Sequence, residues 1–557
     1  MKKVNLAFAQ TRKEIIFINR NIKNKGSITW VPVNLETLIF FEENKINYLN
    51  PLTFLKNNFH KEGIIGSEKM IKKFKFRNNL DQFLVNRYIG IQRKYFNSCF
   101  FINEVLKKIK KKYLINKIFL SGWQSFSFVN PENNYFLSKI LKNSFLRNKV
   151  ILLNRDKINN SRKIYDFKII TSEFKDNYII VSNLGYNFKR IFFNLFNKKI
   201  KIATFNQERL PWYKKTIYKI LGLKIIKIKK INSKKKIKIN IPKIHFIFKK
   251  INYSNIINSR KNEALHELQE LKNLSLVVKS FLQNNKPKLI MLNVLRGING
   301  YLSESSEKLN IPCLQISHGT LSLTGNKYSN KYNKILSEEL TTKKGNIFCV
   351  QSKIADKFVK KFRKNSQNIK TGNLIFNQTI KNNGSDILYA VTNRGFDGMH
   401  FYGIEMFYEY FQNLIFLNKI AKSIKNKKII VKPHPTEFKS IPYLKKIFKN
   451  LYFTDQKNHI LFKKIGVTIS YSSTIIEDSL NSKIPVILFD QWKRYKHCDS
   501  ETNTSKKNSA VYYVNSKNNL GKCIKTIVKS TKFNFQKYIY ERENSKSFKK
   551  LFNNLSI

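Results

Sequence analysis

Short apolar runs separated by polar or glycine-containing turns recur along the chain. Near the carboxyl end, three such runs cover 429–431, 466–469 and 485–489. Runs that are apolar throughout are typical of parallel strands buried on both faces. Longer segments with apolar residues at helical spacing, as at 262–282, separate the runs. The pattern predicts an α/β fold with parallel sheets.

The amino-terminal half repeats this alternation. A strand at 27–33, a helix at 35–44 and a strand at 46–49 predict a first βαβ unit. Further strands are expected at 115–121, 149–154, 178–182, 289–294 and 311–316. The opening residues, MKKVNLAFAQTRKE, contain an apolar stretch too short for a signal peptide, and we interpret them as a basic leader.

The predicted strands divide the chain into two large domains. Residues 1–330 are expected to form a Rossmann-like domain with a basic insertion near 214–250. A polar, basic crossover at 321–344 leads to a second Rossmann-like domain at 345–530, and residues 531–557 are expected to form a helical tail. Five scattered cysteines without C-x-x-C spacing favour a reducing compartment and no disulfide or zinc framework.

A histidine between two prolines ends the run at 429–431. In KPHP, Pro433 and Pro435 each lack a backbone donor and fix their own φ, so His434 cannot lie inside a helix or a strand. We expect it on a stiff turn at the carboxyl end of a strand. A purely structural histidine is the alternative, although packing alone seldom requires so constrained a turn.

A pair of serines follows the run at 466–469. Ser472 and Ser473 precede TIIED, which is predicted to begin a helix. Serine is a favoured N-cap, and the free amides at a helix start bind anions, so the pair is either a helix cap or part of an anion site. Open α/β sheets bind ligands in a crevice at the carboxyl ends of their strands. His434 and the serines are therefore expected to face one crevice.

These residues resemble motifs of known transferases. KPHP, YSST-x-x-E and NSKIPVILFD are similar to the HP and SS motifs of bacterial GT-B transferases that build surface polysaccharides: polysialyltransferases, capsule Kdo transferases and teichoic-acid glycerophosphotransferases. The resemblance implies a GT-B-like fold, in which two Rossmann-like domains face an interdomain cleft. It also implies that His434, Ser472 and Ser473 hold the phosphate of a nucleotide-activated donor.

Two candidates for the catalytic base follow from the same resemblance. SHGT, after the strand at 311–316, resembles the HG element whose histidine is taken as the base in the glycerophosphotransferases, which implies this role for His318. A neutral imidazole suits removal of a hydroxyl proton near pH 7, and a strand-end histidine bonded to a carbonyl group is the alternative. Asp397, in an Asp-Gly pair, resembles the acidic motif of polysialyltransferases but lies later in the chain than theirs. A turn residue is the other interpretation of Asp397.

Further residues complete the expected donor site. Thr392 and Arg394, at the end of a strand predicted at 386–392, are expected to contact a phosphate, because a guanidinium group pairs with phosphate bidentately. Glu477 either bonds the ribose hydroxyls or is a surface acid on its helix. The sequence has no motif with metal-ligand spacing, and neither a metal nor another cofactor is expected.

The charge of the chain raises a second class of partner. Lys and Arg number 105 against 35 Asp and Glu, a formal charge of +70. Such an excess suits nucleic acid or anionic membranes, but the abundance of Lys, Asn and Ile throughout is also typical of an AT-rich genome. No zinc-finger, KH or RRM signature is present, so no specific nucleic acid is expected. The lysine-rich stretch at 214–250 is either a solvated sheet edge or a patch that docks on anionic lipid.

The resemblance, together with these features, implies a metal-independent, inverting glycosyltransferase of capsule or lipopolysaccharide biosynthesis. Its expected partners are a CMP-, CDP- or UDP-activated donor, a glycan or lipid-linked acceptor and an anionic inner-membrane surface. Because no apolar run reaches about 18 residues, we expect it in the cytoplasm, free or peripheral on the inner membrane. Two alternatives remain. One is a UDP-amino-sugar epimerase-like enzyme, whose acid/base carboxylates are scarce here; the other is a basic membrane- or nucleic-acid-binding scaffold without turnover.

Overall fold

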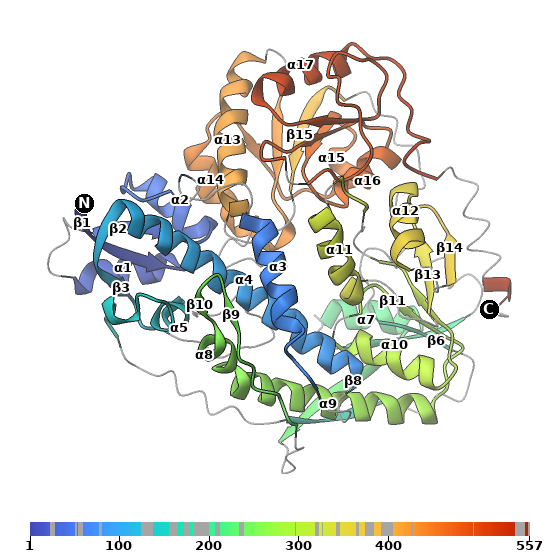
Figure 1. Cartoon of the computed structure of the whole chain (residues 1–557). Coiled ribbons are helices and arrows are strands. Elements are labelled where there is room, and N and C mark those ends of the chain that lie inside the picture. Colours follow the sequence, from blue (N-terminus) through green and yellow to red (C-terminus); the bar gives the residue numbers. More distant parts are fainter. Residues whose placement is uncertain are drawn as a thin grey trace. The chain divides into compact units, whose positions relative to one another are not determined.

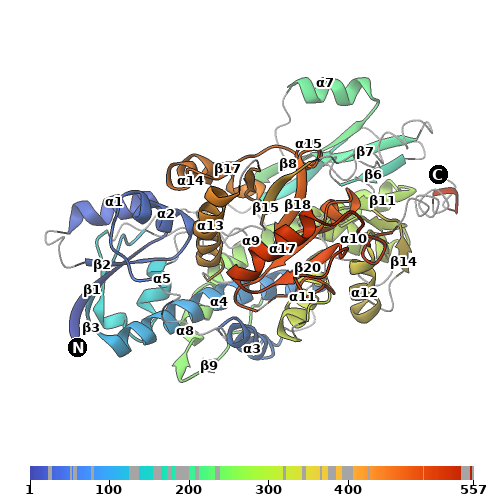
Figure 2. The ribbon, with the colours of Figure 1, turned by 90° about the horizontal axis from the view of Figure 1, so that it is seen from above.

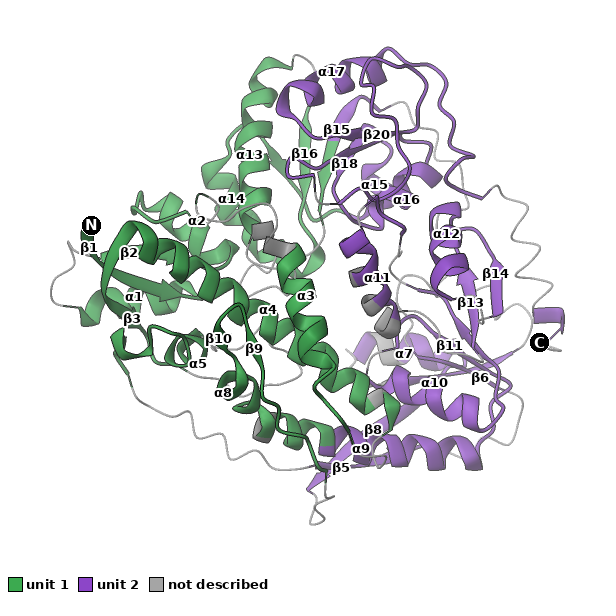
Figure 3. Cartoon of the chain, viewed as in Figure 1, with its two compact units in different colours: residues 1–162, 238–268, 388–456 green, residues 163–237, 269–387, 457–557 purple. Residues whose placement is uncertain are grey.

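The chain forms two compact units in a computed structural model (Figure 3). Unit 1 comprises residues 1–162, 238–268 and 388–456, and unit 2 comprises residues 163–237, 269–387 and 457–557. The structure describes all residues except 23–27, 51–52, 54–58, 77–80, 124–136, 155–164, 172–177, 183–199, 207–211, 233–238, 296, 318–321, 326, 341–345, 364–366, 374–383, 392–404, 425–426, 494, 541–551 and 555–557. Among the described residues, no helix combines the length and the apolar character needed to cross a membrane.

Unit 1 opens with a four-stranded parallel sheet in the order β2-β1-β3-β4 (Figure 1). Its strands are β1 (Lys2–Ala9), β2 (Ile28–Pro32), β3 (Tyr113–Leu120) and β4 (Val150–Leu152). β1 pairs in parallel with both β2 and β3, so the segment interpreted as a leader is an inner strand. The strand expected at 46–49 forms only a single bridge, between Trp30 and Tyr48.

The first and second segments of unit 1 also contain helices and a short hairpin. They are α1 (Arg12–Asn21), α2 (Leu35–Glu43), α3 (Phe59–Ile71), α4 (Gln82–Lys112), α5 (Leu137–Lys142), η4 (Arg147–Lys149), β9 (Ile247–Phe248), β10 (Ile251–Asn252) and α8 (Ser254–Asn258). Buried side chains of β1, α1 and α2 form one apolar core, which includes Ala7, Ile15 and Phe41. Burial of these apolar side chains favours the parallel arrangement.

Unit 2 contains an eight-stranded sheet in the order β14-β13-β12-β11-β6-β7-β8-β5. Its strands are β5 (Tyr165–Ile170), β6 (Tyr178–Val181), β7 (Lys201–Asn206), β8 (Lys224–Asn232), β11 (Leu289–Leu292), β12 (Cys313–Gln315), β13 (Ile347–Val350) and β14 (Gln367–Lys370). The strands are parallel except β5, which runs antiparallel to β8 at the edge. β13, which we expected to open the second domain, pairs with β12 in this sheet.

A third sheet has the order β17-β16-β15-β18-β19-β20. Its strands are β15 (Asp386–Ala390), β16 (Ile429–Lys432), β17 (Tyr452–Phe453), β18 (Ile465–Ser470), β19 (Val486–Phe489) and β20 (Val511–Val514). β16 and β17 belong to unit 1, and β18, β19 and β20 belong to unit 2. The pairs β16–β17, β18–β19 and β19–β20 are parallel, as the three apolar runs predicted.

The remaining helices precede, separate or follow the strands of the second and third sheets. They are α7 (Trp212–Ile220), α9 (Lys261–Asn284), α10 (Ile298–Lys308), α11 (Lys327–Leu340), α12 (Lys353–Phe362), α13 (Glu405–Ser423), η5 (Pro435–Ser440), α14 (Ile441–Ile447), α15 (Asn458–Leu461), α16 (Ile475–Asn481) and α17 (Lys517–Val528). α11 lies in the segment expected to be a polar, basic crossover. The predicted α/β class with parallel sheets is confirmed, and the predicted domain boundaries remain predictions.

Candidate functional site

Ser472 and Ser473 lie between the end of β18 and the start of α16. The residue at the N-cap of α16 is Thr474, and no side-chain capping bond is formed there. Ser473 Oγ accepts the Ile475 N–H at 3.4 Å, which leaves its own hydroxyl proton to donate. Within the described part of the chain, the Ser472 hydroxyl forms no hydrogen bond. Both half-buried serines therefore have a donor for an incoming anion.

An aromatic contact joins these serines to two other loops of unit 2. The ring of Tyr471 lies 5.4 Å from that of Tyr495, in the loop after β19. The Tyr495 hydroxyl lies 3.3 Å from Ser322 Oγ, in the loop after β12, and accepts the Asn333 amide N–H at 3.4 Å. Burial raises the pKa of Tyr495 above its ordinary value, so its hydroxyl is neutral at pH 7. This contact holds the ends of β12, β18 and β19 together.

His497 lies in the loop after β19, close to Tyr495, and the sequence did not indicate it as a candidate site residue. Its side chain is buried, its Nδ1 lies 3.4 Å from Ser322 Oγ, and its Nε2 has no hydrogen-bond partner among the described residues. Burial lowers the pKa of His497 from 6.5 to about 4, because the charged form loses hydration. The imidazole is therefore neutral at pH 7. Its position shortly after the end of a predicted strand could have selected it as a candidate, because His318 and His434 were selected at such positions.

Glu477 is buried rather than exposed on the surface of α16. Its Oε1 accepts the Ser352 hydroxyl at 3.3 Å, and Ser352 Oγ in turn accepts the Ala355 N–H at 3.0 Å as the N-cap of α12. The carboxylate thus connects the helix after β18 to the helix after β13. A contact between Glu477 and a ribose remains a prediction.

A cavity of about 210 Å³ adjoins these loops within unit 2. Its lining residues come from the loop after β12, from α12, from the loop after β19 and from the tail: Leu323, Thr324, Gly325, Lys353, Ile354, Lys357, Lys496, Cys498, Asp499, Lys537 and Tyr538. Four of them are lysines and one is an acid. Since a water molecule occupies about 30 Å³ in the liquid, the volume corresponds to about seven waters and is large enough to hold a phosphate group.

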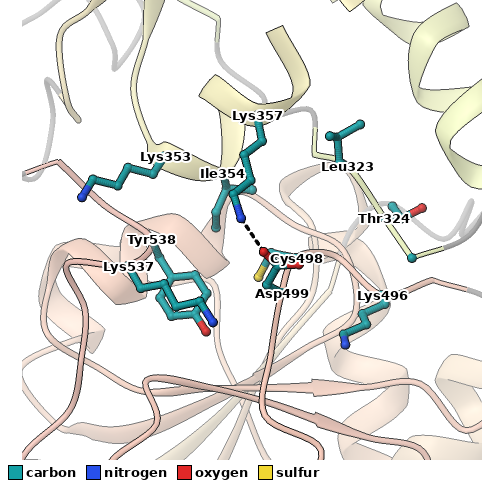
Figure 4. A pocket seen from close by; sticks show the side chains of 11 residues that line it. Leu323, Thr324, Lys353, Ile354, Lys357, Lys496, Cys498, Asp499, Lys537 and Tyr538 are labelled. Carbon is teal, nitrogen blue, oxygen red and sulfur yellow. Dashed lines mark hydrogen bonds and ion pairs between the residues drawn. The ribbon is translucent and has the colours of Figure 1, made fainter. Parts of the chain in front are cut away.

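The charges around this cavity are unbalanced. Lys357 points toward Asp499 and forms an ion pair with it (Figure 4). The hydrogen bond from Lys357 lowers the pKa of Asp499, and the positive charges of Lys537 and Lys496 act in the same direction. One carboxylate therefore faces several ammonium groups, an arrangement that attracts an anion. Sequence analysis could not select these lysines from among the 105 Lys and Arg of the chain.

His434 occupies the stiff turn that the flanking prolines predicted. It follows β16 in unit 1 and is the N-cap of η5. Its Nδ1 accepts the Thr436 N–H at 3.3 Å and lies 2.8 Å from Thr436 Oγ1. Because a backbone N–H always donates, Nδ1 is the unprotonated nitrogen and the ring proton is on Nε2. The Nε2–H group can donate to a phosphate oxygen.

His318, Thr392, Arg394 and Asp397 lie outside the described residues, and their roles remain predictions. The chain on both sides of His318 is held in place. The Ser317 carbonyl accepts the Gln351 Nε2–H at 2.8 Å, and Ser322 contacts Tyr495. The loop that carries the predicted base thus starts and ends at residues with defined partners.

Among the comparisons with known proteins, only the one with solved structures found similar proteins. No family model matches the chain, and no curated protein matches it. A UDP-GlcNAc 2-epimerase from Methanocaldococcus jannaschii, solved with UDP-GlcNAc and UDP, is 14% identical, covers 68% of this chain and 99% of its own, and has a TM-score of 0.40. The wall teichoic acid polymerase TagF is 12% identical; the match covers 68% of this chain and 84% of the TagF chain, with a TM-score of 0.35. TarM from S. aureus is 12% identical; the match covers 69% of this chain and 99% of the TarM chain, with a TM-score of 0.36. Similarity at this level carries no argument about function.

Proposed function

We propose that this chain is a GT-B-like glycosyltransferase of capsule or lipopolysaccharide biosynthesis. It transfers a sugar or polyol phosphate from a CMP-, CDP- or UDP-activated donor to a glycan or lipid-linked acceptor. The observation that carries the proposal is the surroundings of Ser472 and Ser473. Two hydroxyl donors lie beside Tyr471, whose ring contacts Tyr495 in the loop after β19, and that loop lines a lysine-rich cavity. Hydroxyl and ammonium donors are the groups that bind a nucleotide phosphate without a metal.

The proposed reaction with a sugar donor is a single displacement at its anomeric carbon. The acceptor oxygen forms the new bond to this carbon, and the bond to the donor phosphate breaks, so that the nucleotide leaves with the electron pair. His318 takes the acceptor proton. The leaving phosphate accepts hydrogen bonds from His434, Ser472, Ser473 and Arg394, which stabilise its growing charge. Thr392 is proposed to lie beside these donors. Glu477 is the proposed ribose ligand.

Thermal stabilisation by nucleotides tests the donor site. The purified protein is melted with CMP, CDP, UDP or GDP, together with variants His434→Ala and Ser472→Ala. A ligand at 100 times its dissociation constant adds about 2.7 kcal/mol to the free energy of unfolding, which gives a clear shift in Tm. We expect one nucleotide to raise the Tm of the wild type and of the control His459→Ala, whose side chain is exposed on α15, but not of the two site variants.

The reaction products separate the candidate functions. A transferase releases nucleotide only when acceptor glycan is present, and His318→Ala abolishes this release while the thermal shift persists. Conversion of a UDP-amino sugar to its epimer without acceptor would instead identify an epimerase. If no nucleotide stabilises the protein while polyanions stabilise the wild type and the variants equally, the chain is a basic scaffold and the proposal is wrong.

A further inference from the structure

Helix α7 exposes an unusual amount of apolar side chain. Trp212 is 78% exposed, Ile220 is 77% exposed, and Tyr213 and Ile217 are each 49% exposed. The helix has nine residues and lies apart from the other helices of unit 2 (Figure 2). Single exposed apolar residues are ordinary, but four large ones on so short a helix mark an interaction surface.

These residues share one side of the helix. At about 100° per residue, Trp212, Thr216, Ile220, Tyr213 and Ile217 fall within an arc of about 140°. Tyr218 lies on the opposite side and packs against the core of the eight-stranded sheet. The helix is thus amphipathic, but its broad apolar side faces solvent. We call the side chains of Trp212, Tyr213, Ile217 and Ile220 the α7 face.

The chain around the α7 face is strongly basic. Residues 212–232 contain seven lysines and no acidic residue. Lys219, Lys224, Lys227 and Lys229 are exposed among the described residues. β8, which carries three of them, lies between β7 and β5 and is not the sheet edge. Protection of an edge strand therefore does not explain these lysines.

We propose that the α7 face docks on an anionic lipid surface, with the helix lying in the plane of the interface. Trp and Ile side chains enter the boundary between head groups and acyl chains, while neighbouring lysines contact lipid phosphates. This combination of an apolar face and adjacent positive charge matches a membrane interface. A second copy of the chain fits less well, because two strongly basic segments repel each other. The proposal concerns a surface and does not depend on the donor site.

Co-sedimentation with vesicles tests the proposal. The full chain is mixed with vesicles of phosphatidylcholine alone or with added phosphatidylglycerol, at low and high salt. Trp212→Ser with Ile220→Ser removes the apolar anchors, and Leu276→Ser with Val528→Ser is the matched control, since these side chains are 51% and 53% exposed elsewhere. We expect the α7 variant to lose at least about tenfold in affinity for the anionic vesicles, because even one buried apolar side chain contributes that much.

Two further measurements make the outcome decisive. Bromolipids should quench wild-type tryptophan fluorescence, and Trp212→Phe should lose most of the quenching. Lys219→Gln with Lys224→Gln and Lys227→Gln should weaken binding and reduce its dependence on salt. Equal binding of the wild type to both vesicle types, or undiminished binding by the α7 variant, overturns the proposal. A wild-type dimer that becomes a monomer in the α7 variant also overturns it, because the face is then covered by a second copy.

Discussion

The Ser352 hydroxyl donates a hydrogen bond to Glu477 Oε1 at 3.3 Å, between residues 125 positions apart in the sequence. Ser352 begins α12, which follows a strand of the eight-stranded sheet, and Glu477 belongs to α16, which follows a strand of the six-stranded sheet. Both side chains are buried. The bond therefore joins α12, which lines the cavity, to α16, the helix that follows Ser472 and Ser473.

A double-mutant cycle measures this connection. Ser352→Ala removes both the cap of α12 and the bond to Glu477, and Glu477→Ala removes the bond and a buried carboxylate. We expect a coupling free energy of about 1–3 kcal/mol in urea unfolding, the range for a buried bond to a charged group. Ser516→Ala is the matched control, because Ser516 caps α17 in the same way without contacting Glu477. Additive effects in the Ser352 cycle would contradict the connection.

Glu14 should make the free energy of unfolding decrease as pH rises. Burial raises the pKa of Glu14 from 4.5 to about 7, although bonds from Ser121 and two backbone amides favour its ionised form. Between pH 4.5 and 7 the folded protein binds a proton that the unfolded chain releases. Stability from this group is complete below pH 4.5 and falls by about 3 kcal/mol by pH 7. Glu14→Gln should lack this fall in urea unfolding measured across pH, whereas the exposed Glu307→Gln should retain it.

His497 should act in the opposite direction over nearly the same pH range. Its folded-state pKa is about 4, against an ordinary value of 6.5, because the imidazole is buried. Below pH 6.5 the unfolded chain takes up a proton that the folded protein excludes, so stability is lost as pH falls to 4, by about 3 kcal/mol. His497→Gln should remove this loss, and the exposed His459→Gln should not. If His497→Gln and the wild type lose equal stability as the pH falls, the prediction that folding buries a neutral His497 is wrong.

Local patterns were sufficient to predict most of the strands. The apolar runs at 429–431, 466–469 and 485–489 became β16, β18 and β19, because strands buried on both faces need continuous apolar sequence. β1 was missed because its charged start and short apolar run resemble a leader. α11 was missed because its polar, basic composition hides a helical pattern in a segment read as a crossover.

The candidate site was predictable only where a local rule determined the geometry. Two prolines fix the turn at His434 whatever surrounds it. The bond between Ser352 and Glu477 depends on packing between distant segments and leaves no local signal. The position of His497 after a strand can be read from the sequence, but its burial depends on the same kind of packing. The cavity lysines differ from other lysines only in their position in the folded chain.

Charge changes in the cavity should alter anion affinity with opposite signs. Lys353→Gln or Lys496→Gln removes a positive charge from the lining and should weaken the binding of pyrophosphate or of the stabilising nucleotide by about tenfold, the effect of losing one charge-assisted hydrogen bond. Asp499→Asn removes the carboxylate that pairs with Lys357 and should tighten binding severalfold. Lys360→Gln is the control, because Lys360 lies on the same helix but pairs with Asp356 outside the cavity. Isothermal titration at low salt measures the affinity of each variant and of the wild type. If Asp499→Asn binds no more tightly than wild type, the cavity is not part of the anion site.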